Sequence, residues 1–263
     1  MSPLSDTAAA ELRPRLKGRV ITPGDEAYDE ARMPFYGGFD RTPALIARVA
    51  DAADVSIVVR LARETGVELA VRSGGHSVAG HSVSDGIVLD LSEMHVIDVD
   101  VENRTAWAET GLTAAGFAND AVSYGLGVGF GDTGSVGIGG ITLGGGIGYL
   151  VRKHGLTIDD LLAAEIVTAD GELLHADEDS HPDLFWAIRG GGGNFGVATR
   201  FRFRLHELDM VVGGMLMLPA TAETIEGFVA QADAAPRELS TIANVMPAPP
   251  LPFVPEERHG QLV

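Results

Sequence analysis

The 263-residue sequence contains no cysteine. This absence excludes disulfide bonds, thiolate metal ligands and any cofactor linked through cysteine, and it is consistent with a reducing cytoplasm, the compartment we expect. Lysine is almost as scarce, because Lys17 and Lys153 are the only two in the sequence and neither stands in a Gly-x-x-x-x-Gly-Lys-Ser/Thr pattern. The sequence therefore contains no Walker A loop for a nucleoside triphosphate.

Basic residues are also few. The chain carries 19 basic against 37 acidic residues, a formal net charge of -18. Such a field repels the phosphates of nucleic acids and of acidic membranes, so we expect a small-molecule partner, with no nucleic acid and no membrane partner. The most apolar window, residues 138–151, is too rich in glycine for a membrane span, and no signal-peptide core is found.

Helices are predicted over three segments of the first two hundred residues. Asp51 can cap the first helix, whose apolar residues recur at helical spacing, and Gly66 is well placed to end it. Thr113 can cap the second, over residues 114–124, and the third covers residues 183–189.

Strands are predicted between these helices. Short apolar or alternating runs bounded by polar turns indicate strands at residues 67–72, 86–92, 96–100, 105–110 and 197–205. An Asp-Gly turn between two apolar runs indicates a β-hairpin over residues 165–175. Residues 125–148 contain so many glycines that we expect no ordinary helix or strand there.

The composition changes beyond about residue 210. One apolar strand is predicted at residues 211–218 and one helix after Thr221, and a proline-rich stretch follows at residues 247–255. We therefore divide the chain into an N-terminal segment, a central domain and the beginning of a second, incomplete domain, with boundaries at 1–36, 37–210 and 211–263.

Two familiar patterns fit the sequence poorly. Residues 191–196, "GGGNFG", satisfy Gly-x-Gly-x-x-Gly, but a Rossmann site needs a strand before the glycines and a helix after them, and here the predicted order is reversed. Gly75-His-Ser-Val-Ala79 approaches a nucleophile elbow with Ser77 as nucleophile. The elbow must enter a helix, whereas turn formers follow Ser77, so a serine hydrolase is only an alternative.

A metal site is not predicted. His76 and His81 lie five residues apart in a loop, with no cysteine or acidic cluster beside them, and this spacing matches no common ligand pattern.

The two glycine-rich loops are explained better by one shared ligand than by separate turns. Backbone N–H groups in tight turns bind a pyrophosphate well, and glycine lets the backbone approach the oxygens closely. Residues 72–77 offer one such loop, and residues 133–148, "TGSVGIGGITLGGGIG", offer a second, where a flat aromatic ring could lie against bare backbone.

Four blocks in order resemble a known family. They are "VRSGGHSVAG" (71–80), "GDTGSVGIGGITLGGGIGYLVRKHGLTIDDLL" (131–162), "EIVTADGELLHA" (165–176) and "HPDLFWAIRGGGGNFGVATRFRFRL" (181–205). Over about residues 15 to 210 the chain is similar to FAD-linked oxidases of the vanillyl-alcohol oxidase or PCMH type, in their berberine bridge enzyme-like branch. The fold that this implies is α+β: a PCMH-type FAD-binding domain of two α/β subdomains, followed by the start of a truncated α+β substrate domain.

The resemblance also implies cofactor-binding residues. His76 takes the position of the histidine that bonds through its ring to the 8α-methyl of FAD, inside a pyrophosphate loop formed by Arg72, Ser73, Gly74, Gly75 and Ser77. The second flavin-contacting segment corresponds to Thr133, Ser135, Gly139, Gly140, Gly144 and Gly145, and Val167 corresponds to a residue that meets the adenine side by its backbone. Doubly linked members carry cysteine where Thr133 stands, so a single covalent link is expected.

The implied activity is that of an FAD-dependent oxidase. It would take a hydride from a substrate C–H, at an alcohol or sugar carbon, to the flavin and pass electrons to oxygen. The family's substrate region, which holds its catalytic base, follows the part matched here, so no catalytic residue can be named. A truncated, non-catalytic flavin-binding module is the main alternative, and a hydrolase using Ser77 is the third.

Overall fold

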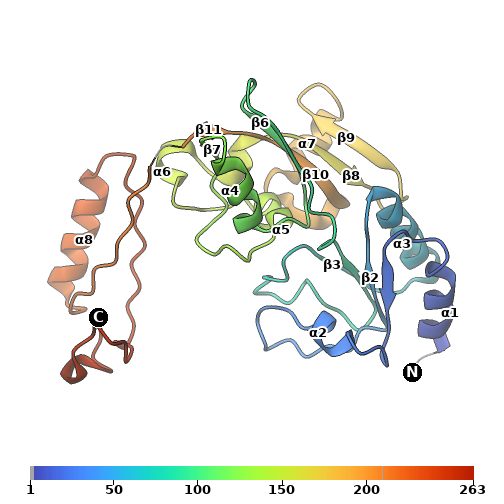
Figure 1. Cartoon of the computed structure of the whole chain (residues 1–263), viewed down its shortest axis with the longest axis horizontal. Helices are drawn as coiled ribbons and strands as arrows, with labels where there is room; N and C mark the ends of the chain where they lie inside the picture. The colour runs from blue at the N-terminus through green and yellow to red at the C-terminus, as the bar shows by residue number, and fades with distance from the viewer. Residues whose placement is uncertain (1–2, 209) are drawn as a thin grey trace. The chain divides into compact units, whose positions relative to one another are not determined.

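The computed structural model describes residues 3–208 and 210–263. The chain forms two compact units, the first of Met1–Gly148 with Leu156–Leu208 and the second of Tyr149–Gly155 with Asp209–Val263. Figure 1 shows the strands of the first unit, which contains every residue implied as cofactor-binding. No helix among the described residues is both long and apolar enough to span a membrane.

A four-stranded sheet begins the first unit, in the order β1-β2-β4-β3. β1 (Arg19–Ile21) pairs antiparallel with β2 (Leu45–Arg48), whereas β4 (Ile87–Asp90) lies parallel to both β2 and β3 (Leu69–Arg72). Most residues of these strands are apolar because helices cover the sheet. Helix α1 (Pro3–Leu12) and helix α3 (Ala52–Thr65) contribute apolar residues to one core cluster with β2 and β4, and the short α2 (Tyr28–Arg32) belongs to another.

Helix α3 forms as its sequence signals predict. The side chain of Asp51 accepts a hydrogen bond from the N–H of Asp54, and Gly66 ends the helix with a left-handed φ of 68°. Asp54 itself is buried, at 1% exposure, because its carboxylate accepts bonds from the backbone N–H groups of Lys17, Gly18 and Ala50 at 2.9, 2.8 and 3.1 Å. The start of α3 is therefore tied to the segment that leads into β1.

A five-stranded antiparallel sheet forms the rest of the core, in the order β5-β6-β10-β8-β9. Its strands are β5 (Ile97–Asp100), β6 (Thr105–Glu109), β8 (Leu161–Val167), β9 (Leu173–Asp177) and β10 (Val197–Arg204). The predicted hairpin is confirmed, since β8 and β9 pair around the Asp-Gly turn. Alternate residues of β10 are buried, and Phe203 packs edge to face against Phe117 and Phe130.

Short helices cover this second sheet and connect it. They are α4 (Ala114–Val122), α5 (Ile138–Leu143), α7 (Pro182–Gly191) and the 3-10 turns η1 (Thr157–Asp160) and η2 (Gly192–Phe195). A two-stranded sheet joins β7 (Leu126–Gly127) and β11 (His206–Glu207). Val167 and Val197, from the five-stranded sheet, belong to the same buried cluster as β2 and α3, so the two sheets share part of a core.

The second unit contains α6 (Val151–His154), α8 (Ala222–Ala234) and η3 (Glu256–Arg258). The predicted helix after Thr221 is confirmed, and the Thr221 hydroxyl caps it by accepting from Thr224 N. Arg152 holds this unit together by donating to the carbonyls of Leu239 and Ala235, each at 2.9 Å.

Two local predictions were wrong. Residues 211–218 form no strand in the described part of the chain, where Val212 and Leu216 are 95% and 88% exposed. A strand needs a neighbour to take its backbone hydrogen bonds, and no described segment pairs with this one. Conversely, the glycine-rich segment 125–148 does contain regular structure, the short strand β7 and the six-residue helix α5. Buried Ile138 and Leu143 anchor α5 to the core despite its two glycines.

Candidate functional site

The loop at residues 73–77 leaves the carboxyl end of β3 directly. Gly75 has φ +75°, in the left-handed region that favours glycine. The hydrogen bonds found among the described residues leave the backbone N–H groups of this turn, from Gly74 to Ser77, without an acceptor. Consecutive free N–H groups in a turn with a left-handed residue are typical of an anion-binding concavity.

The second glycine segment packs backbone to backbone against this loop. A Cβ added to Gly74 would lie 2.2 Å from Gly137 N, and one added to Gly137 would lie 2.1 Å from Gly74 N. Any side chain at either position would force the two loops apart, because backbone atoms cannot move aside as a flexible side chain does. Glycine at both positions is therefore required by this close approach.

Ser73 joins the same two segments through its hydroxyl. Ser73 Oγ donates to the carbonyl of Thr110 at 2.5 Å and accepts from the N–H of Gly139 at 3.3 Å. A Cβ at Gly139 would meet Thr110 O at 3.0 Å and Ser73 Oγ at 3.1 Å. Packing inside the protein thus accounts for both Ser73 and Gly139.

The guanidinium of Arg72 is occupied by contacts within the protein, although its side chain passes close to Gly75. Its side chain is buried, at 7% exposure, and donates to the carbonyls of Ala31, Arg32 and Ser82. Burial lowers the pKa of the guanidinium, while Asp90 acts in the opposite direction. With three carbonyls holding the guanidinium, any contact of Arg72 with a ligand would come from its backbone.

His76 is held at the open end of the loop. Its Nε2 lies 3.0 Å from Ser135 Oγ, and its ring stacks on Phe35 with centroids 3.9 Å apart and planes 19° from parallel. Tyr36 meets the same ring edge-on at 6.3 Å. Burial lowers the pKa of His76, which favours the neutral imidazole near neutral pH.

The other residues of the second segment differ in how far packing explains them. Gly145 has φ +110°, and Gly144 has a carbonyl oxygen 3.4 Å from where its Cβ would be. Gly140 is exposed, and nothing lies within 4 Å of a Cβ added there. Thr133 is exposed and its hydroxyl donates to Asp132 at 3.0 Å. Gly140 is thus the glycine whose identity internal packing leaves unexplained.

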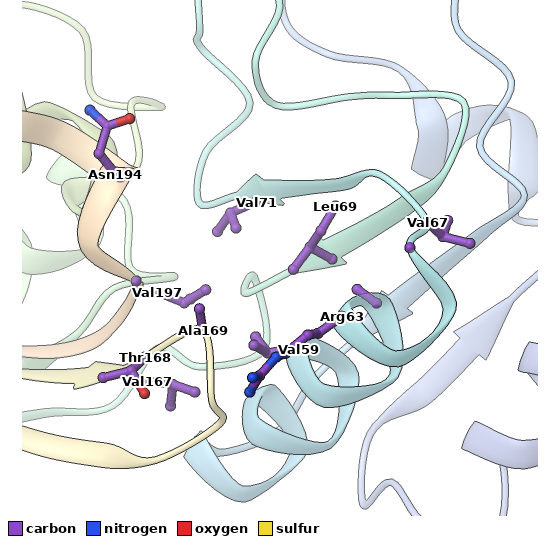
Figure 2. Close-up of a pocket in the computed structure, with 14 residues that line it drawn as sticks. Val59, Arg63, Val67, Leu69, Val71, Val167, Thr168, Ala169, Asn194 and Val197 are labelled. Atoms are coloured by element: carbon purple, nitrogen blue, oxygen red, sulfur yellow. The ribbon is translucent and has the colours of Figure 1, made fainter.

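An open cavity of about 520 Å³ lies in the first unit, and its lining includes Val71 of β3, two residues before the loop begins. Figure 2 shows Val71 and Leu69 of β3 facing it from one side and Val167, Ala169 and Val197 from the other. Further polar and apolar groups line it: Val59, Arg63, Val67, Thr168, Gly193, Asn194 and Gly196. An apolar cleft with a few polar groups, at the start of a loop with free N–H groups, is typical of a small-molecule site.

The model of one protein family, described as "FAD binding domain", matches residues 43–177, just over half of the chain. The chain belongs to this FAD binding domain family. The resemblance to FAD-linked oxidases drawn from the sequence is therefore confirmed, and the fold is that of a PCMH-type FAD-binding domain.

This chain has relatives that are named oxidases and relatives that are named FAD-linked oxidoreductases. It is 39% identical over 211 residues to (R)-6-hydroxynicotine oxidase of Paenarthrobacter nicotinovorans, covering 79% of this chain and 46% of that protein. The solved structure of Physcomitrella patens BBE-like 1 matches with TM-score 0.73 and 29% identity, covering 76% of this chain and 44% of that one.

A third relative is described as having covalently bound FAD. It is the glucooligosaccharide oxidase of Acremonium strictum, described with a 6-S-cysteinyl, 8α-N1-histidyl FAD. The TM-score is 0.70 and the identity 30%, covering 77% of this chain and 42% of that one. The chain therefore spans less than half the length of each of these three relatives.

The residues of this chain fit an FAD molecule. The turn at 74–77 offers N–H donors to a diphosphate, the bare backbone at Gly140 leaves room for a flat ring, and the neighbouring cavity has apolar walls. The backbone of Val167 lies at this cavity, where a Cβ on Gly196 would come within 2.5 Å of its carbonyl oxygen.

Sequence reasoning missed two groups of residues at the site. Phe35 and Tyr36 lie far from the glycine loops in sequence, and their signal was a pair of aromatics in a polar segment followed by two glycines. Gly193 and Asn194 belong to the pattern that failed as a Rossmann fingerprint, yet both line the cavity. The dense glycines did indicate a ligand site, but the Rossmann order of strand, glycines and helix does not occur here.

The structure disfavours the serine hydrolase alternative. Ser77 Oγ accepts from the backbone N–H of His81 at 3.1 Å, while the His76 ring bonds to Ser135 instead. Turns, and no helix, follow Ser77 up to β4. A nucleophile elbow needs both a base at the serine and a helix after it. Within the described residues, no three metal-ligating side chains converge.

Proposed function

We propose that this chain is the FAD-binding part of an oxidase in which His76 carries the flavin through a single covalent bond. The oxidase would take a hydride from a C–H of a small molecule, at an alcohol or sugar carbon, with oxygen as electron acceptor. One observation carries the proposal: the His76 ring is fixed by Ser135 and Phe35 at the open end of a loop with free N–H groups.

The binding residues divide between the two halves of FAD. In this proposal, the N–H groups of residues 74–77 bind the diphosphate, and the cavity beside Val167, Thr168 and Asn194 takes the adenosine. Gly140 and Ser135 lie on the flavin side, near His76. Gly139, Gly144, Gly145 and Thr133 complete the segment that passes along the flavin, with Arg72 and Ser73 bracing the loop from behind.

Bound FAD supplies the redox chemistry by accepting a hydride and passing electrons on. The residues of this chain bind it, orient it and hold the neutral imidazole of His76 in a fixed plane. No residue of this chain is assigned as catalytic acid or base.

A single link through His76 is favoured by the residue at position 133. The relative described above carries one cysteinyl and one histidyl bond to FAD, whereas Thr133 has no thiol and the whole sequence has no cysteine. In this chain Nδ1 of His76 would correspond to the N1-histidyl nitrogen, since Nε2 faces Ser135. The proposed domain boundaries remain residues 1–36, 37–210 and 211–263, with the FAD-binding domain in the middle.

A non-catalytic flavin-binding module is the second candidate. The chain covers 46%, 44% and 42% of the three relatives described above, and no catalytic acid or base is assigned among its residues. Turnover separates the two functions: the oxidase proposal expects flavin bleaching by an alcohol, sugar or hydroxynicotine under anaerobic conditions. Bound flavin that stays oxidised with this chain, but bleaches in a longer protein containing it, would favour the module.

The binding proposal is tested by titration with FAD and FMN. The protein should become yellow with FAD and keep its colour through gel filtration, and FMN should bind more weakly because it lacks the adenosine that the cavity would hold. Replacing Asn194 by Trp should block the cavity and bring the affinity for FAD down to that for FMN. A protein that stays colourless with excess FAD would refute the proposal.

A further inference from the structure

The contact between Ser135 and His76 joins residues 59 positions apart in the chain. The backbone around Ser135 is fixed to the first turn of α4, since Ala114 N donates to Val136 O at 2.8 Å and Ala115 N donates to Gly134 O at 2.9 Å. Ser135 O also lies 3.0 Å from the position of a Cβ on Gly74. The hydroxyl is therefore presented to the His76 ring by a braced loop.

One face of the His76 ring is also held in place. Phe35 stacks on His76, and the backbone N–H of Phe35 donates to the carbonyl of Gly75 at 3.1 Å, next to His76 in sequence. The stack fixes the plane of the imidazole, and the Ser135 bond fixes its rotation within that plane. Nε2 is therefore directed at Ser135, and Nδ1 is the ring nitrogen that remains for a bond to another group.

A neutral imidazole carries its proton on one ring nitrogen and a lone pair on the other. We propose that Ser135 is a positioning residue for flavin attachment: its hydroxyl oxygen accepts a hydrogen bond from Nε2–H and so keeps the lone pair on Nδ1, the atom that bonds to FAD. This inference rests on the covalent attachment proposed above and adds the residue that selects the reactive tautomer.

The attachment step balances with oxygen as oxidant. The Nδ1 lone pair forms a bond to the 8α carbon, which gives up one C–H proton, and the electron pair of that C–H bond remains on the flavin, which is thereby reduced. The imidazole, briefly a cation, donates its Nε2 proton to Ser135 more strongly and then releases one proton. Molecular oxygen takes up two electrons and two protons to give hydrogen peroxide, and the linked flavin is again oxidised.

The same geometry explains why the ring must stay neutral. A protonated imidazole has no lone pair at Nδ1, so it cannot form the bond. Burial lowers the pKa of His76, which keeps the ring neutral at pH 7. Arg72, four residues before His76, donates to backbone carbonyls, and Arg32, close to Phe35 in sequence, pairs with Asp29 and Asp40.

The experiment compares Ser135→Ala with Ser135→Thr and with the control Ser123→Ala, a serine exposed at the end of α4. Apo protein is mixed with FAD, and the flavin that stays with acid-precipitated protein is followed in time. At FAD concentrations that saturate each protein, we expect Ser135→Ala to attach the flavin roughly tenfold more slowly than the unchanged protein, about 1.4 kcal/mol. Ser135→Thr should restore the rate, because threonine keeps the hydroxyl.

A second measurement needs no variant. Nitrogen NMR of apo protein labelled at histidine should show His76 protonated at Nε2, and the Ser135→Ala spectrum should show a mixture of both tautomers. Attachment at an unchanged rate in Ser135→Ala, an Nδ1-protonated ring in the unchanged protein, or loss of all FAD binding in Ser135→Ala would each overturn the inference. If the unchanged protein binds FAD but never attaches it, the proposed covalent link fails instead.

Discussion

Substitutions at Gly140 can distinguish a glycine required for ligand binding from a glycine required for packing within the protein. It lies in helix α5, it is exposed, and apart from the backbone of its own helix and its chain neighbours no described atom stands within 4 Å of a Cβ placed there. Ala should therefore fit without strain. Glycine in a helix costs roughly 0.5–1 kcal/mol relative to alanine, so Gly140→Ala should be as stable as the unchanged apo protein or slightly more so.

The expected change in melting temperature is small and upward. A domain of this size shifts by roughly 2–4 °C per kcal/mol, so Gly140→Ala should melt up to about 3 °C higher in the absence of FAD. Gly140→Leu adds a larger side chain, and leucine has nearly the same helix propensity as alanine. If the flavin lies against this backbone, Leu should overpack the interface by about 1–3 kcal/mol and raise Kd for FAD roughly tenfold or more.

The assay pairs thermal unfolding of apo protein with fluorescence titration by FAD. Gly227→Ala is the matched control, because Gly227 also lies in a helix, α8, with open space around its Cβ, but in the second unit. By the same helix-propensity argument it should raise the melting temperature by up to about 3 °C, and it should leave Kd unchanged. Normal FAD affinity in Gly140→Leu would refute the placement of flavin at Gly140, and a lower melting temperature in Gly140→Ala would refute the packing argument.

Three further predictions concern stability. Gly137→Ala should destabilise the apo protein by about 3 kcal/mol or more, seen in urea unfolding, because its Cβ would stand 2.1 Å from Gly74 N; unchanged stability would show that the two loops are not in contact. Asp54→Ala should cost roughly 3 kcal/mol by leaving three backbone N–H groups without their acceptor, and a loss under 1 kcal/mol would contradict that account. Because burial lowers the pKa of His76 below its unfolded value near 6.5, its contribution to stability is present above pH 6.5 and lost as pH falls through the lowered pKa. Urea unfolding of His76→Gln between pH 7.5 and pH 5 should therefore show a smaller loss of stability than the unchanged protein, and an equal loss would be evidence against this.

The local structure was predictable wherever one short signal decided it. Asp51 and Gly66 bound helix α3 as expected, Thr113 caps α4, and the Asp-Gly turn lies between β8 and β9. Each depends on groups a few residues apart, whose preferences are independent of the rest of the fold. The strand expected at 211–218 failed because pairing is a property of two segments, and apolar character in one segment says nothing of its partner.

The candidate site was predictable only in outline. The glycine loops and His76 stood out in the sequence, but no pattern could show that Gly74 and Gly137 touch through their backbones or that Ser135 bonds to His76. Such contacts depend on how two sheets pack, which spacing along the chain does not encode. Phe35 illustrates the same point, because its stacking on His76 follows from a loop that precedes β2.

The proposed oxidase depends on the attachment of the flavin to His76. Acid precipitation of the FAD-incubated protein tests it most directly, because denaturation releases flavin that is merely bound and retains flavin that is bonded. The unchanged protein should leave a yellow pellet and gain the mass of one FAD less two hydrogens, and His76→Ala should bind FAD reversibly and leave a white pellet. A white pellet from a flavin-saturated unchanged protein, or a yellow one from His76→Ala, would contradict the account.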